Sequence, residues 1–185
     1  MNIVRLEKNN RQGMDDVMQM LVESFPHSWP NKHSALEVID YCLEDGNIAL
    51  VAVEAGQVLG FIGGQPQYGQ TGWELHPLVV RSDRQGRGIG AKLVRALEGE
   101  ILRRGGVMIY LGTDDEEGKT TLSNCDLYPN LLKQIGAVRN LDNHPFEFYK
   151  KVGFEIVGVL PDANGLGKPD ILMAKRLGRS ANEDA

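Results

Sequence analysis

The sequence predicts a layered α/β domain (α+β class) in which about four helices flank a mixed central sheet of about six to seven strands. Short apolar runs typical of strands occur in both halves of the chain and alternate with segments whose apolar residues have helical spacing. Hydrophobic residues make up 42% and charged residues 24% of the 185 residues, so the chain can bury a core. This length favours one domain, expected over residues 1–177, followed by a disordered tail over residues 178–185.

Periodicity and turn residues predict the elements of the first half in order. Four apolar runs are predicted strands: residues 3–6, 48–54, 58–64 and 73–81. A helix over residues 14–25 ends before Pro26. Ser34 and Glu37 have the spacing of a capping box, which predicts a second helix beginning at Ser34. Pro77 interrupts the fourth strand and predicts a bulge or a sheet edge there.

One long helix dominates the second half of the chain, over residues 88–104. Large aliphatic residues recur at every fourth position of this segment, at Ile89, Leu93, Leu97 and Ile101. Gly105 and Gly106 follow and are expected to end the helix. Later runs predict strands over residues 107–111, 154–160 and 170–175, a short helix over 145–151, and a mixed, partly helical segment over 120–140.

Charge and composition exclude several classes of function. Asp and Glu total 25 against 20 Lys and Arg, and the net charge of −5 disfavours nucleic-acid binding but suits a cationic small molecule. No apolar run approaches the roughly 18 residues of a membrane span, and the N-terminus lacks a signal-peptide core, so a cytoplasmic protein without membrane contact is expected. The four histidines lack ligand spacing, so no metal is expected. Cys42 and Cys125 are expected to be buried thiols.

A glycine-rich turn separates the fourth strand from the long helix. Gly86, Gly88 and Gly90 allow the backbone to approach a bulky group closely. The first N–H groups of a helix carry partial positive charge, and Arg84 and Arg87 lie beside them in the sequence. The turn therefore predicts a pyrophosphate site, with a purely structural turn as the alternative.

The spacing of Gln85, Gly88 and Gly90 (Q-x-x-G-x-G) resembles the acyl-CoA pyrophosphate signature of the GNAT superfamily of N-acetyltransferases. The resemblance implies the GNAT acyl-CoA N-acyltransferase fold, with strands that splay at the acetyl-CoA cleft, and acetyl-CoA as the co-substrate. Ten residues would then hold acetyl-CoA: Leu78, Val79, Val80, Gln85, Gly86, Arg87, Gly88, Ile89, Gly90 and Ala91.

Two polar side chains precede this turn on one face of the fourth strand. The two-residue period places Glu74 and His76 on one face and Trp73 and Leu75 on the other. Acetyl transfer to an amine requires the neutral amine, so Glu74 is the candidate general base and His76 the second candidate. The alternatives are an exposed strand carboxylate and a histidine that only packs. Backbone N–H groups near residues 78–80 would stabilise a developing oxyanion.

Longer segments between Pro66 and Lys175 resemble one family of this superfamily, the chromosomal-type aminoglycoside 6′-N-acetyltransferases of bacteria. They include Pro66-Gln-Tyr-Gly, Gly72-Trp-Glu-Leu-His-Pro, Ile109-Tyr-Leu-Gly-Thr-Asp-Asp and Val157-Gly-Val-Leu-Pro. The resemblance implies direct acetyl transfer, through a ternary complex, to the 6′-amine of an aminoglycoside. It also implies a homodimer and a role in aminoglycoside resistance.

The resemblance also assigns roles to single residues. Glu74 would be the base, His76 a nearby helper, and Tyr149 the acid that protonates the leaving sulfur, unless Tyr149 only caps the core. Six residues would bind the acceptor: Phe25, Trp29, Tyr68, Glu74, Asp114 and Asp115. The two aspartates belong to an acidic run that predicts either a wall for a polycation or a solvated loop.

Two other functions fit the same residues. The acceptor could be a polyamine or a basic peptide, since an acidic cleft suits these as well. The chain could also be a non-catalytic acyl-CoA sensor. Glu74 together with Tyr149 argues against a sensor, because a sensor needs neither a base nor an acid.

Overall fold

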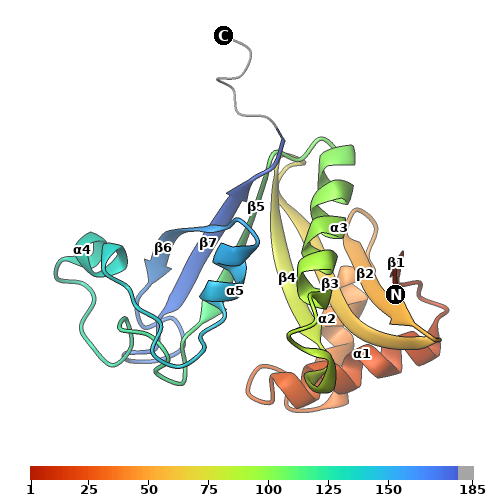
Figure 1. Cartoon of the computed structure of the whole chain (residues 1–185), viewed down its shortest axis with the longest axis horizontal. Helices are drawn as coiled ribbons and strands as arrows, with labels where there is room; N and C mark the ends of the chain where they lie inside the picture. The colour runs from red at the N-terminus through yellow and green to blue at the C-terminus, as the bar shows by residue number, and fades with distance from the viewer. Residues whose placement is uncertain (179–185) are drawn as a thin grey trace, which may run out of the picture. The chain divides into compact units, whose positions relative to one another are not determined.

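The computed structural model describes residues 1–178 of the chain, and these residues form an α/β fold (Figure 1). Within this range seven strands form a sheet in the order β1-β2-β3-β4-β5-β7-β6. The strands are β1 (Asn2–Arg5), β2 (Ile48–Glu54), β3 (Gln57–Tyr68), β4 (Gly72–Val80), β5 (Met108–Asp114), β6 (Glu155–Leu160) and β7 (Asp170–Arg176). The helices are α1 (Arg11–Ser24), α2 (Lys32–Cys42), the 3-10 turn η1 (Ser82–Arg84), α3 (Ile89–Arg103), α4 (Leu131–Gly136) and α5 (Phe146–Lys151).

The predicted α/β class is confirmed, and the strands and helices follow each other along the chain as predicted, except that α4 is one helix more than the sequence predicted. This short helix lies in the segment over residues 120–140 that was expected to be partly helical. The predicted tail lies outside the described residues except for Gly178. No helix among residues 1–178 is long and apolar enough to cross a membrane.

The chain divides into two compact units, which are described separately. The N-terminal unit comprises Met1–Ile109 and is rejoined by the chain at Leu177, and the C-terminal unit comprises Tyr110–Arg176. The single domain expected over residues 1–177 stays a prediction.

Strands β1 to β4 of the N-terminal unit pair antiparallel, and helices cover both of their faces. Phe61 of β3 belongs to the buried cluster that α1 and α2 supply with Val17, Leu21, Ala35 and Ile39. Gly60 and Gly64 lie on the other face of β3. A Cβ at Gly60 would lie only 3.0 Å from a methyl group of Leu93, and a Cβ at Gly64 only 2.6 Å from a methyl group of Leu97. The helix α3 therefore packs on the opposite face, and glycine is required where it approaches β3.

The helix α3 begins and ends at the predicted glycines. The aliphatic residues at every fourth position, from Ile89 to Ile101, are each at most 5% exposed. Gly105 has a φ of +83° and donates to the Leu102 carbonyl, while Gly106 donates to that of Ile101. These two bonds form a Schellman C-cap.

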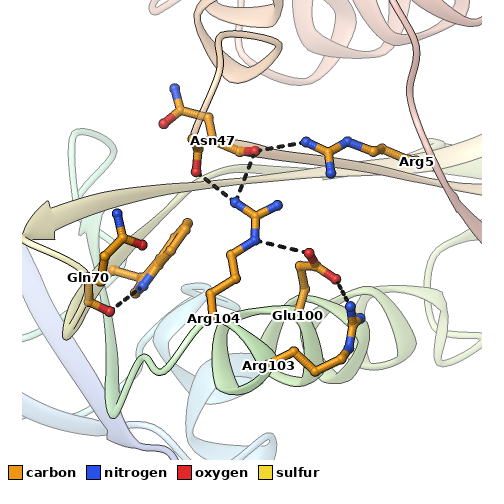
Figure 2. A network of polar contacts seen from close by, with 8 residues as sticks. Arg5, Asn47, Gln70, Glu100, Arg103 and Arg104 are labelled. Carbon is orange, nitrogen blue, oxygen red and sulfur yellow. Dashed lines mark hydrogen bonds and ion pairs between the residues drawn. The ribbon is translucent and has the colours of Figure 1, made fainter.

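Just after this helix, Arg104 joins three elements (Figure 2). Its guanidinium donates to the Gly46 carbonyl at 2.7 Å and to the Glu100 carboxylate at 3.0 Å, and it lies 5.5 Å from the centre of the Trp73 ring. Arg5 of β1 donates to the neighbouring carbonyl of Asn47 at 3.2 Å. The network holds the end of α3 against β4 and the loop before β2.

Two local predictions were wrong. The helix α2 begins at Lys32 rather than at Ser34, because the Asn31 side chain accepts the N–H groups of His33 and Ser34 and so caps the helix three residues earlier. Cys42 is buried, but Cys125 is exposed in the loop before α4.

Candidate active site

The predicted polar face of β4 is present in the structure. Trp73 and Leu75 are 0% and 4% exposed, whereas Glu74 is partly buried and His76 is exposed. The register with β3 changes between the pairs Gly64–Leu75 and Ile62–Leu78, and the His76–Pro77 peptide bond is cis. The bulge predicted from Pro77 is therefore confirmed.

A buried polar cluster lies under this bulge. Gln65 is 1% exposed, and its Nε2 donates to the His76 carbonyl at 2.7 Å and to Cys42 Sγ at 3.2 Å. Burial raises the pKa of the Cys42 thiol to about 12, although the hydrogen bond from Gln65 opposes this, so the thiol stays protonated. A Cβ at Gly63 would collide with the His76 carbonyl and with Cys42 Sγ. The cluster thus fixes the backbone of β4 at the position of His76.

Sequence reasoning did not single out Gln65. A polar residue that directly follows the apolar run of β3 was the available signal, because a buried amide needs hydrogen-bond partners.

The structure brings Phe25, Trp29 and His76 together. The rings of Phe25 and Trp29 meet edge to face with centroids 5.2 Å apart, and Trp29 lies 5.7 Å from the imidazole of His76. The backbone N–H of Trp29 donates to the Phe25 carbonyl at 2.8 Å, which closes the loop between α1 and α2. Tyr68, at the end of β3, is 67% exposed. Two of the predicted acceptor-binding residues thus lie beside the polar face of β4.

The backbone of β4 directs N–H groups to both edges of the strand. The Arg81 N–H donates to the Leu59 carbonyl of β3 at 3.0 Å. Successive residues of an antiparallel strand direct their N–H groups to opposite edges. The N–H groups of Leu78 and Val80 therefore point away from β3, as an oxyanion site requires.

The glycine-rich turn has the geometry of an anion site. Gly86 and Gly88 have φ values of +72° and +77°, and a Cβ at either position would meet nothing within 4 Å, so the turn is open. The first bond of α3 runs from the Lys92 N–H to the Gly88 carbonyl, which leaves the amides of Ile89, Gly90 and Ala91 without a partner inside the helix. The residues present therefore fit a pyrophosphate.

The side chain of Gln85 has a structural role in this turn. Its side chain donates to the Val80 carbonyl at 3.1 Å and so ties the turn to the end of β4. The Asp83 carboxylate forms ion pairs with both neighbouring arginines: its oxygens lie 3.1 Å from Nε of Arg81 and 3.3 Å from Nε of Arg84. The predicted contact of Gln85 with acetyl-CoA stays a prediction, and its backbone is the part that remains available for it.

Asp115, in the C-terminal unit, was predicted to bind the acceptor as part of an acidic wall, and this prediction is wrong. Its side chain is 1% exposed and accepts hydrogen bonds from the N–H groups of Lys119 and Thr120, at 2.6 Å and 2.8 Å, and from the Ser123 hydroxyl at 2.5 Å. Burial favours the neutral form, but these hydrogen bonds prevail and lower the pKa of Asp115. The carboxylate holds the loop after β5 together and does not face solvent.

Asp114 remains a candidate for acceptor binding. It is exposed, and its carboxylate accepts a hydrogen bond from Asn164 at 2.5 Å. Its backbone carbonyl lies 3.1 Å from Nε2 of the buried His144, whose Nδ1 accepts the Phe146 N–H at 3.2 Å. Burial lowers the pKa of His144, so a neutral imidazole joins β5 to the start of α5.

Tyr149 lies on α5, also in the C-terminal unit, among aromatic rings. Its ring centroid is 5.1 Å from that of Phe148 and 5.7 Å from that of Phe154. Burial raises the pKa of Tyr149 well above its usual value, so the hydroxyl stays protonated at neutral pH. Among residues 1–178, no group of three or more His, Cys, Asp or Glu side chains is placed to hold a metal ion.

Comparison with known proteins identifies the family. The model of the acetyltransferase (GNAT) family matches residues 14–121, which include β4, the glycine-rich turn and α3. The chain belongs to the acetyltransferase (GNAT) family. No curated protein matches this GNAT sequence.

Solved structures of related acetyltransferases match nearly the full length of this GNAT chain. An aminoglycoside 6′-N-acetyltransferase complexed with coenzyme A is 46% identical, with a TM-score of 0.94 over 98% of this chain and 100% of that one. The aminoglycoside 6′-N-acetyltransferase from Enterococcus faecium is 45% identical, with a TM-score of 0.91 and the same coverage. An aminoglycoside 6′-acetyltransferase type Ii is 40% identical, with a TM-score of 0.76 over 97% of this chain and 99% of that one.

Proposed function

We propose that this chain transfers the acetyl group of acetyl-CoA to the 6′-amine of an aminoglycoside and so confers aminoglycoside resistance. One observation carries the proposal: the open glycine-rich turn directly follows the strand that bears Glu74 and the bulge. The full-length similarity to aminoglycoside 6′-N-acetyltransferases, one of them complexed with coenzyme A, supports the choice of acceptor.

The cofactor-binding residues act through the backbone. The N–H groups of the turn between Gln85 and Ala91 would hold the pyrophosphate, since the positive end of α3 lies there. The N–H groups of Leu78 and Val80 would hold the thioester carbonyl and stabilise the negative charge that develops on its oxygen. When bound, acetyl-CoA supplies an activated acetyl group.

Glu74 would take the proton of the acceptor amine. An alkyl amine is mostly protonated at neutral pH and cannot attack a carbonyl in that form. The half-buried carboxylate of Glu74 can accept this proton directly or through one water molecule. His76, exposed two residues further along the same face, is the second candidate.

Tyr149 would stabilise the leaving sulfur. Because its pKa is raised above that of a thiol, roughly 8.5, the hydroxyl acts first as a hydrogen-bond donor to the thiolate. Tyr149→Phe should lower kcat about tenfold, since a hydrogen bond to a charged group contributes about 1.5 kcal/mol, and should leave the Kd for acetyl-CoA unchanged. Steady-state kinetics and a coenzyme A titration measure the two quantities. Native turnover would show that the Tyr149 hydroxyl does not stabilise the leaving sulfur.

The predicted acceptor-binding residues supply aromatic surface in the N-terminal unit and an acidic group in the C-terminal unit. Phe25, Trp29 and Tyr68 offer ring surface, and Asp114 offers an exposed carboxylate for a polycation. We further propose that the protein is a cytoplasmic homodimer that contacts neither nucleic acid nor membrane; light scattering tests its oligomeric state.

A thiol-release assay with three acceptors tests the proposed function. Purified protein and acetyl-CoA are mixed with kanamycin, spermidine or a lysine-rich peptide, and kcat/KM is measured for each. We expect the aminoglycoside to give the highest value. A higher value for spermidine or the peptide would replace the proposed acceptor, and coenzyme A binding without thiol release would indicate a sensor. No binding of coenzyme A would refute the proposal as a whole.

A further inference from the structure

Gln67 occupies an irregular position of β3, two residues beyond Gln65, which pairs with the candidate base Glu74. The pairing of β3 with β4 runs through Pro66–Trp73 and then changes register before Tyr68–Gly72. One residue of β3, Gln67, thus stands at a bulge without a direct partner in β4. A bulge re-aims the side chain that it carries, and bulges are frequent beside active sites.

The side chain of Gln67 contacts Glu74. Its Nε2 donates to Glu74 Oε2 at 3.0 Å, although the two residues lie seven positions apart in sequence. Within the described residues no other side chain is hydrogen-bonded to this carboxylate. One carboxylate oxygen is therefore held, and Oε1 is left to receive the proton of an amine.

The chemistry of the donor suits a base. A lysine or arginine at this position would form an ion pair with Glu74, and an ion pair lowers the tendency of a carboxylate to accept a proton. A neutral amide orients the carboxylate without cancelling its charge. Without this hydrogen bond, the partly exposed Glu74 side chain could rotate among several rotamers, and Oε1 would occupy several positions.

We propose that Gln67 is a positioning residue that orients the Glu74 carboxylate for proton abstraction from the acceptor amine. The inference rests on the proposed function, because it assigns Gln67 a role through Glu74. Gln67 itself is exposed, so its replacement removes no core contact.

A double-mutant cycle tests this role. Gln67→Met removes the donor and keeps the length of the side chain, and it should lower kcat about fivefold while the KM for acetyl-CoA stays unchanged. Gln67→Glu also removes the amide donor, and charge repulsion moves the Glu74 carboxylate from its position, so kcat should fall at least as far. In a Glu74→Gln background, Gln67→Met should have no further effect, since a residue that acts only through the base loses its role with the base.

Gln12→Met is the matched control, because Gln12 is also an exposed glutamine that donates to a carboxylate, that of Asp16 at 2.9 Å, but it lies on α1. Its kcat should equal that of the unmodified chain. Equal, additive losses from Gln67→Met in both backgrounds, or no loss in either, would overturn the proposal. Failure of the unmodified chain to acetylate an aminoglycoside refutes the proposed function instead, so the two failures are distinguishable.

Discussion

Glu74→Gln should lower kcat/KM for the aminoglycoside roughly a hundredfold or more, because a positioned general base typically contributes 10²- to 10⁴-fold. The amide keeps the size of the carboxylate but cannot take a proton. The acidic limb of the pH profile of kcat/KM should flatten, since the substituted side chain can no longer take the proton of the amine. Coenzyme A affinity should not change, because the glycine-rich turn is untouched.

Glu54→Gln is the control for this substitution. Glu54 is likewise a strand glutamate, but it is the last residue of β2, beside the turn to β3. Its carboxylate forms an ion pair with the N-terminal amine at 3.5 Å. Its pH profile should match that of the unmodified chain. An unchanged profile for Glu74→Gln would remove Glu74 as the base and leave His76 as the candidate.

Asp115→Ala should lower the free energy of unfolding by about 3–5 kcal/mol, because it removes the side-chain acceptor of three buried or partly buried donors, and the loss of such an acceptor costs about 1–3 kcal/mol each before relaxation. The donors are the N–H groups of Lys119 and Thr120 and the hydroxyl of Ser123. A loss of this size is a large share of the stability of an ordinary domain. Urea denaturation followed by circular dichroism measures it.

Asp114→Ala is the matched control, since it removes the preceding carboxylate, which is exposed and accepts one side-chain hydrogen bond. It should cost about 1 kcal/mol or less. Equal stability of the two variants would show that Asp115 is not the residue that holds the loop after β5.

Much of the fold was predictable because local signals agreed with each other. The four-residue series from Ile89 to Ile101 indicated both the length of α3 and the face that it buries, and Gly105 marked its end. Pro77 indicated the bulge in β4 because proline removes a donor from the ladder. The start of α2 was predicted wrongly, because Ser34 and Asn31 are both good caps and only the backbone conformation decides between them.

The candidate site was predictable only in part. The face that carries Glu74 and His76 follows from the two-residue period of a strand, and the anion site follows from glycines before a helix. The glutamines that support β4 were not predicted. Gln65 reaches the His76 carbonyl and Gln67 reaches Glu74 through the register between two strands.

The sequence by itself determined the class of fold, the glycine-rich turn before α3 and the polar face of β4, because each depends on the spacing of neighbouring residues. The tertiary structure alone decided which polar groups are available to a ligand. Asp114 and Asp115 are adjacent and identical in the sequence, yet the loop after β5 closes over one and exposes the other. The Asp115 carboxylate is covered by irregular loop contacts with Lys119, Thr120 and Ser123, and contacts of this kind leave no periodic trace in the sequence.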